Sequence, residues 1–262
     1  MKYLVLSSML LFSVLKCFAQ NDPPHKWGCS VAINSIQGQI AIPIMTGAGA
    51  EIIDADGNIL SGGNRVDHSY SFSVVPKHYI NEDLLLRFEF GITNLALDAN
   101  FDGQFSPYRW IYSKQVATKI YRYSPGFQWI FLKKKNIESY CGLSASYCDY
   151  KSIHTYTYDE HRDLATDTLD YWSSGKETTP GGYAIGVGAF AGFNIYLLKR
   201  FSVGAELSSS ASYYKIGGES VLEGMDQALP SPTISSTSTY ANSYRGFKIS
   251  KIISSFNISI WF

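Results

Sequence analysis

The chain has 262 residues, and its 22 basic side chains balance its 22 acidic ones, so the formal net charge is zero. This balance excludes the strongly basic surface that nucleic-acid-binding proteins use, and we expect no nucleic-acid partner. After the first twenty residues, no segment reaches about 18 uninterrupted apolar residues, which excludes a transmembrane helix there. The remainder is therefore either a soluble domain or a membrane β-barrel. Abundant tyrosine, phenylalanine, glycine and serine favour the barrel.

The first residues have the pattern of a secretory signal peptide. A basic residue precedes an apolar run that ends at Leu15, and Cys17 and Ala19 offer a small-residue cleavage site. The run is too short to cross a bilayer as a helix, which needs about 20 residues. We predict that residues 1–19 are a cleaved signal peptide and that residues 20–262 form one exported domain.

The cysteines indicate neither a metal site nor a disulfide framework. Cys29, Cys141 and Cys148 remain after such a cleavage, and no pair of them has metal-ligand spacing. The last two lie on one predicted strand, on opposite faces and about 23 Å apart, so they cannot bond to each other. Acylation of Cys17 is the alternative to simple cleavage, but Lys16 stands where that processing uses a small residue. We expect no metal and no cofactor.

Apolar and polar residues alternate with a period of two in segment after segment. In residues 84–93, Leu84, Leu86, Phe88, Phe90 and Ile92 alternate with Leu85, Arg87, Glu89, Gly91 and Thr93. Residues 183–195 and 201–207 repeat the pattern. Such alternation is typical of strands that turn one face to lipid and the other to a polar interior.

Eight segments alternate in this way, an even number as bacterial single-chain barrels require. They cover residues 29–44, 66–77, 84–96, 115–132, 137–149, 183–197, 201–214 and 246–262, with a β-bulge expected near Asn34 in the first. The connections alternate between long polar ones (45–65, 97–114, 150–182 and 215–245) and short ones (78–83, 133–136 and 198–200). We expect long extracellular loops, the last two of them mobile, and short periplasmic turns. The predicted fold is all-β: a single eight-stranded antiparallel up-and-down transmembrane β-barrel after a cleaved signal peptide.

The parity of the strands assigns a set of charged side chains to the interior. An eight-stranded barrel has room only for side chains or one small ligand. A lysine or arginine facing lipid near the midplane would cost about 2–4 kcal/mol, so we place these charges inside and expect them to pair. The predicted lumen charge network consists of Arg87, Glu89, Arg122, Glu138, Glu206 and Lys251. A gated narrow conduit is the alternative interpretation.

Aromatic residues recur near the predicted strand ends, as in the interfacial girdles of membrane barrels. The periplasmic set is Trp129, Phe131, Phe201 and Trp261, and the outer set is Tyr70, Tyr121, Tyr123, Tyr147 and Tyr213. Ligand stacking is the alternative role for the outer tyrosines. In the acidic 150–182 segment, His154 and His161 are seven residues apart in an expected loop, which gives no defined metal-ligand geometry.

The C-terminal segment resembles the terminal signature of outer-membrane β-barrel proteins, because Phe256, Ile258, Ile260 and Phe262 alternate with polar residues up to the last position. In that family the assembly machinery of the outer membrane reads the last strand, and the resemblance implies this machinery as a partner and the four residues as an assembly signal. The stretch 188–207 is also similar to the central hairpin of small eight-stranded outer-membrane β-barrel domain proteins from Bacteroidetes. The resemblance implies an outer-membrane location in a Gram-negative-type envelope, among outer-membrane lipid and lipopolysaccharide.

These observations predict fold and location but no specific activity. We expect a non-enzymatic integral outer-membrane protein, structural in the envelope or binding an extracellular ligand of unknown identity through its long loops, with a filled lumen that is not an open pore. The alternatives are a narrow channel for small hydrophobic ligands and a lipid-modifying enzyme. Lipid A deacylase barrels carry a His and a Ser two residues apart on a lipid-facing strand, whereas Tyr70 stands two residues after His68 here.

Deletion of Phe262 tests the assembly signal. The deletion removes one lipid-facing side chain, worth about 1.5–3 kcal/mol by burial, which is too little to open a closed barrel. We therefore predict a strong fall in the amount inserted in cells, while the inserted fraction keeps nearly normal heat-modifiable migration on gels. Normal insertion would show ordinary packing at this position, and a large loss of thermal stability would show a role in barrel closure.

Overall fold

The computed structural model describes residues 26–34, 52–53, 59–60, 64–67, 70–105, 107–250 and 252–262. Within these ranges no helix has the length and apolar character needed to cross a membrane. The predicted signal peptide, the bulge expected after Asn34 and Lys251 all lie outside the described residues.

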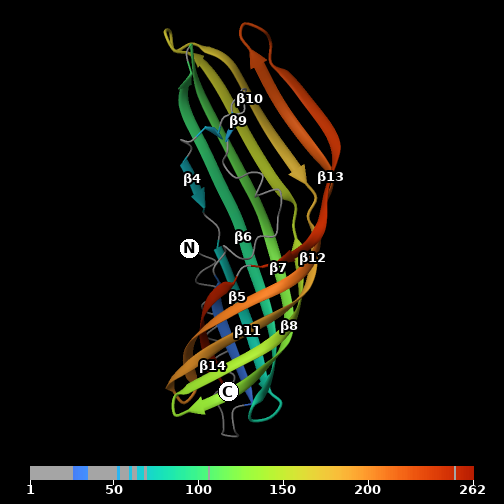
Figure 1. The fold of residues 1–262 in the computed structure, drawn as a ribbon. Helices are drawn as coiled ribbons and strands as arrows, with labels where there is room; N and C mark the ends of the chain where they lie inside the picture. Colours follow the sequence, from blue (N-terminus) through green and yellow to red (C-terminus); the bar gives the residue numbers. More distant parts are fainter. Residues whose placement is uncertain are drawn as a thin grey trace.

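Eight strands form a closed antiparallel ring in which each strand pairs with the next along the chain (Figure 1). They are β1 (Trp27–Asn34), β5 (Tyr70–Tyr79), β6 (Leu84–Phe105), β7 (Tyr108–Lys134), β8 (Ile137–Tyr150), β11 (Gly182–Leu198), β12 (Phe201–Ala228) and β14 (Ile253–Trp261). The ring closes where β14 pairs with β1, from Gly28 opposite Trp261 to Asn34 opposite Ser255. The predicted eight-stranded antiparallel up-and-down barrel is confirmed.

Short turns gather at one end of the ring. β7 and β8 are joined by Lys135 and Asn136, and β11 and β12 by Lys199 and Arg200. Between β5 and β6, the side-chain oxygen of Asn81 accepts a hydrogen bond from the amide of Leu84 at 2.9 Å. The start of β1 and the end of β14 lie at this same end, as the long-short alternation predicts.

The outer face of the ring is apolar and uncharged over the height of a bilayer. Leu143 and Val187 expose 68% and 66% of their surfaces, values that fit lipid contact better than water contact. On β11 every second residue from Tyr183 to Leu197 points outward. This segment is longer than the roughly 9–11 residues that a tilted membrane strand needs. Outward tyrosines such as Tyr147 mark the upper edge of this belt, and Trp129 marks the lower edge. They form the predicted girdles.

Beyond the belt, the strands continue into a tall sheet that we call the raised wall (Figure 1). It contains the upper parts of β6, β7 and β12 together with β4 (Asn64–Asp67), β9 (Ile153–Asp163), β10 (Leu169–Thr179) and β13 (Ile234–Ile249). β9 follows β8 along the edge of β7, and β10 pairs with both β9 and β12. A separate two-stranded pair joins β2 (Ile52–Ile53) and β3 (Ile59–Leu60).

The expectation of long polar loops in residues 97–114, 150–182 and 215–245, the last two of them mobile, is therefore wrong. These residues are mostly paired strands. The lipid-type alternation ends there because both faces of the wall meet water, so a search for apolar positions cannot find them. The β-forming composition remains, as in the Ile-His-Thr-Tyr-Thr-Tyr sequence that opens β9.

Strand interruptions occur where the ring gives way to the wall. The β8–β9 break is bridged by the amide of Lys151, which donates to the carbonyl of Lys119 at 2.9 Å. Across the β10–β11 break, the amide of Gly217 donates to the carbonyl of Gly181 at 2.9 Å. Gly217 has a φ of 94°, in the left-handed region that favours glycine. At Gly181, a Cβ atom would lie 1.8 Å from the carbonyl oxygen of Tyr150, so only glycine fits.

The tip of the β9–β10 hairpin has a well-defined turn. One carboxylate oxygen of Asp163 accepts hydrogen bonds from the amides of Ala165 and Thr166, at 2.8 and 2.9 Å, and from the Thr166 hydroxyl at 3.0 Å. These donors, led by the Thr166 amide, hold the pKa of Asp163 below its ordinary value. The turn is therefore ordered by its own side chain, as an Asx-type turn is.

We predict that, among the described residues, proteolysis of intact cells cuts the hairpin tips at residues 164–168 and 229–233 and not the strands of the raised wall. Backbone pairing withholds the strand amides from a protease, which needs an extended, unpaired segment. Treatment with a broad-specificity protease, followed by mass spectrometry of the fragments, measures this. Equally rapid cutting within 169–179 would contradict the paired wall, and cutting at 133–136 on intact cells would invert the topology.

Candidate functional site in the barrel interior

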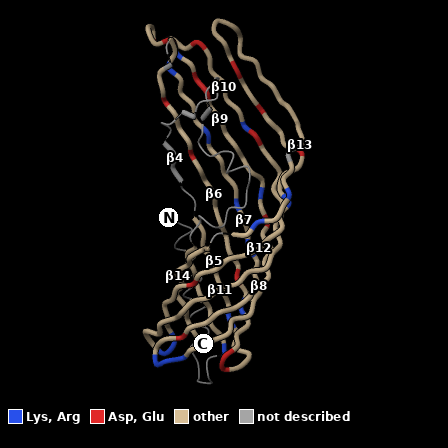
Figure 2. Tube along the Cα trace, viewed as in Figure 1, with Lys and Arg blue, Asp and Glu red and all other residues tan. Residues whose placement is uncertain are grey.

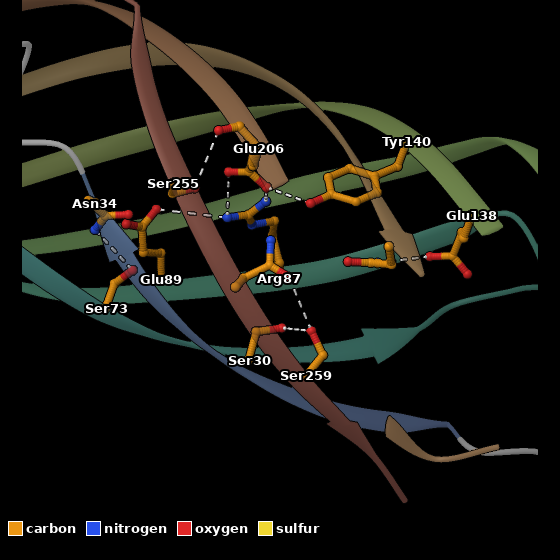
Figure 3. A network of polar contacts seen from close by, with 12 residues as sticks. Ser30, Asn34, Ser73, Arg87, Glu89, Glu138, Tyr140, Glu206, Ser255 and Ser259 are labelled. Atoms are coloured by element: carbon orange, nitrogen blue, oxygen red, sulfur yellow. Dashed lines mark hydrogen bonds and ion pairs between the residues drawn. The ribbon is translucent and has the colours of Figure 1, made fainter. Parts of the chain in front are cut away.

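The centre of the lumen holds a chain of ion pairs (Figure 3). Arg87 on β6 reaches across to Glu206 on β12, with Nη1–Oε2 and Nη2–Oε1 distances of 2.6 and 3.2 Å. Glu89 lies between two guanidinium groups, 3.9 Å from Arg87 and 4.0 Å from Arg122. Four of the six residues assigned to the interior by parity thus lie within one group of alternating charges.

The Arg87–Glu206 pair is almost withdrawn from solvent, with side-chain exposures of 5% and 11%. The Tyr140 hydroxyl donates a third hydrogen bond to Glu206, at 3.1 Å. The guanidinium carbon of Arg87 also lies 4.1 Å from the centroid of the Phe190 ring, in cation–π range. A buried ion pair balances its desolvation cost only with good geometry and extra hydrogen bonds, and this pair has both.

Glu138 is also inside but does not join the arginines. Its Oε2 atom accepts hydrogen bonds from the hydroxyls of Tyr196 at 3.0 Å and Tyr79 at 3.3 Å. The amide nitrogen of Asn194 donates to its other oxygen at 3.5 Å. Glu138 therefore forms a second polar group, nearer to the short turns. The sixth residue, Lys251, is outside the described part of the chain.

Besides Lys248 on β13, which lines the larger cavity of the lumen, sequence reasoning missed the interior charge of Lys77 on β5. The side chain is only 3% exposed, and its ammonium lies 5.8 Å from the ring centroids of both Tyr140 and Trp261. Lys77 shares the inward parity of Ser71 and Ser73, which was the available signal. Lys77 is the last residue of the predicted segment 66–77 and follows Pro76, so the alternation ends at this position.

An inner apolar layer lies in the lumen toward the short turns. It consists of Leu85, Ile130, Tyr140, Phe190 and Trp261. Trp261 is 2% exposed, and its indole N–H donates to the hydroxyl of Ser202 at 3.4 Å, so the prediction of a girdle role for Trp261 is wrong. Its parity is that of the inward Asn257 and Ser259, and strand parity decides the direction of a side chain whatever its aromatic character. Gly28 provides the space, because a Cβ there would lie 2.4 Å from the indole.

An outer apolar layer lies at the other end of the lumen, at the height where the ring becomes the wall. Its buried members are Leu95, Leu97, Val116, Ile120, Tyr150, Ile153, Ala184 and Ile216. They come from β6, β7, β8, β9, β11 and β12, so the layer crosses most of the ring. These side chains continue the inward rows of the ring but are apolar where the rows below are polar.

A small polar chamber lies between the two layers. The larger of its two cavities has a volume of about 70 Å³ and is lined by serines of β7, β8 and β12, with Arg122 and Cys148. A neighbouring cavity of about 20 Å³ borders Lys77 and Glu89. Such volumes hold a few water molecules. Within the described residues, the polar space thus lies between two apolar layers.

The histidines of the 150–182 segment lie on β9 and point to opposite faces of the wall, since seven residues separate them. His154 contacts the Thr178 hydroxyl at 3.3 Å, whereas His161 lies 3.3 Å from Asp159. His161 also packs against Trp110 and Tyr171, with ring centroids 5.9 and 5.6 Å away. Among the described residues, no group of three or more His, Cys, Asp or Glu side chains could hold a metal ion.

The closed antiparallel ring, the uncharged apolar belt and the charged interior define an integral outer-membrane β-barrel. The chain belongs to the family described as "Protein of unknown function (DUF3575)", whose model matches residues 80–217. No curated protein matches the sequence.

Solved outer-membrane proteins are similar in structure at low sequence identity. The outer membrane protein OprG from Pseudomonas aeruginosa is 10% identical, with 91% of this chain and 96% of that one covered and a TM-score of 0.44. CarO from Acinetobacter baumannii is 8% identical, with 92% and 100% covered and a TM-score of 0.32. The outer membrane protease OmpT from Escherichia coli is 6% identical, with 91% and 94% covered and a TM-score of 0.34.

We predict that Arg87→Met destabilises the barrel by about 3–5 kcal/mol, because it leaves the Glu206 carboxylate buried without its partner. The double variant Arg87→Met with Glu206→Met should regain most of this loss, since no uncompensated charge remains. Urea unfolding in detergent micelles, followed by tryptophan fluorescence, measures both. Arg109→Met is the matched control: it breaks the exposed Arg109–Asp102 pair and should change stability little. A double variant as unstable as Arg87→Met would contradict the role of charge compensation.

Proposed function

We propose that the protein is a non-enzymatic outer-membrane barrel with a closed lumen, which acts at the cell surface through its raised wall. One observation carries the proposal: two apolar layers lie in series across the lumen, with the ion pairs between them. An ion that crossed would have to pass both layers and also disrupt a desolvated bidentate pair, and each step costs several kcal/mol.

The raised wall supports a surface-interaction role because its strands are paired. β7 has 27 residues and β12 has 28, so each is one continuous element from the short-turn end of the ring to the top of the wall. A surface held in this way loses little conformational entropy when it binds a partner. Binding residues are often presented by a rigid scaffold, and here the barrel is that scaffold.

The surroundings of the barrel follow from its belt. The uncharged outer face would contact lipid, and the tyrosines at its upper edge would lie at the lipopolysaccharide headgroups. The last strand also fits recognition by the assembly machinery, because Phe256 and Ile258 expose 52% and 43% of their surfaces on the outer face. Phe262 is the residue after the end of β14, and its amide donates a hydrogen bond to the carbonyl of Trp27 at 2.8 Å.

We predict no stable single-channel conductance for the purified protein in planar bilayers at physiological salt. Removing the inner layer with Tyr140→Ala and Trp261→Ala should leave the protein non-conducting, because the outer layer remains; the pair Leu97→Ala and Ile216→Ala should behave likewise. Conductance is expected only when the two pairs are combined and the Arg87–Glu206 ion pair is also removed, with Arg87→Ala and Glu206→Ala. Porin-like conductance of the unmodified protein would contradict the closed lumen and would favour the channel alternative.

A further inference from the structure

A large cavity in the described part of the chain lies outside the polar chamber, at the short-turn end of the barrel. Its volume is about 510 Å³, which falls within the roughly 300–1,000 Å³ of small-molecule sites. It lies at the mouth of the ring, because its lining combines the inward residues Tyr79, Tyr196 and Trp261 with residues 80–82 of the β5–β6 turn. We call this cavity the vestibule.

Aromatic rings form the floor of the vestibule. The Trp261 ring lies 5.2 Å from that of Tyr79 and 6.4 Å from that of Tyr196, centroid to centroid. Both tyrosine hydroxyls donate to Glu138, so their polar ends are already satisfied. What remains for a ligand is the partly exposed ring surface of Tyr79 and Tyr196, since Trp261 is itself only 2% exposed.

Three lysines and one carboxylate lie around this floor. Lys26, Lys133 and Lys199 line the vestibule together with Glu82, so basic residues are in excess. The ammonium of Lys133 donates to the carbonyl of Glu82 and lies 3.9 Å from Asp83. In the part of the chain that the structure describes, no carboxylate lies within ion-pair distance of Lys26 or Lys199. Figure 2 shows basic residues clustered at this end of the barrel.

An aromatic platform beside unpaired ammonium groups suits a ligand that combines a ring-shaped body with carboxylates. The ring C–H groups can pack on the aromatic floor, and the carboxylates can pair with the lysines. We propose that the vestibule binds the disaccharide-peptide units of peptidoglycan, in which sugar rings are joined to a carboxylate-bearing stem peptide. The inference rests on the orientation adopted in the proposed function, which places this end in the periplasm, where that polymer lies.

The test uses the full mature protein in micelles, titrated calorimetrically with a soluble disaccharide-peptide released from peptidoglycan by a muramidase. The unmodified protein should bind it, and binding should weaken with added salt. The double variant Lys26→Glu with Lys199→Glu should weaken binding at least tenfold. Lys134→Glu is the matched control, because this lysine lies on the same rim but does not line the vestibule, and it should bind normally. Heat-modifiable migration verifies that each variant is folded.

Three comparison probes separate the contributions. Chitobiose has the sugar rings without carboxylates, and the free stem peptide has carboxylates without the sugar; each should bind at least tenfold more weakly than the complete fragment. Vesicles containing phosphatidylglycerol supply anionic lipid and should not compete. Absence of binding, equal binding of either partial probe, competition by the vesicles or an equal defect in Lys134→Glu would each overturn the proposal.

Failure here can be distinguished from failure of the proposed function. Binding in micelles exposes both ends of the barrel, so it does not depend on orientation or on a closed lumen. Conductance in planar bilayers is measured without the fragment. A non-conducting barrel that ignores the fragment loses only the vestibule proposal, and a conducting barrel that binds it loses only the closed lumen.

Discussion

This structure depends on one constraint: within lipid, every backbone N–H and C=O group must find its hydrogen-bond partner inside the protein. Lipid cannot bond an exposed N–H or C=O, so the strands must close on themselves, and β14 must find β1. Closure with eight strands leaves an interior about as wide as its own side chains. Because the outer face of the closed ring meets lipid, Arg87 and its partners have their lowest free-energy cost in the interior. The ring, the narrow lumen and the internal charges therefore follow from one requirement.

Inside the ring, the inward rows change character with height. Near the short turns they are aromatic, at the centre they are charged or hydroxylated, and at the start of the wall they are aliphatic. Two consequences follow for the interior. Arg87 and Glu206 fix β6 against β12 across the lumen through a bidentate contact, and the polar chamber has an apolar layer on either side of it.

The alternation of apolar and polar residues was enough to predict the ring, the turns and the direction of most membrane-level side chains. It placed Arg87, Glu89 and Glu206 together because parity and the cost of a charge in lipid give the same result. It could not reveal the raised wall, where both faces are wetted and the alternation disappears. Lys77 was missed because the alternation ends at this position, and Trp261 was misjudged because its aromatic character near the chain end was given more weight than parity.

The irregular positions between ring and wall, at Gly181 and Gly217, have a consequence for how such a protein can diversify. In Figure 1 the strands run obliquely below this height and more steeply above it. Because the bends lie at the level of the outer apolar layer, the wall can be lengthened, shortened or re-aimed from there upward without disturbing the register of any strand in lipid. The ring in the membrane then keeps a constant structure, while the raised wall can vary in length and direction.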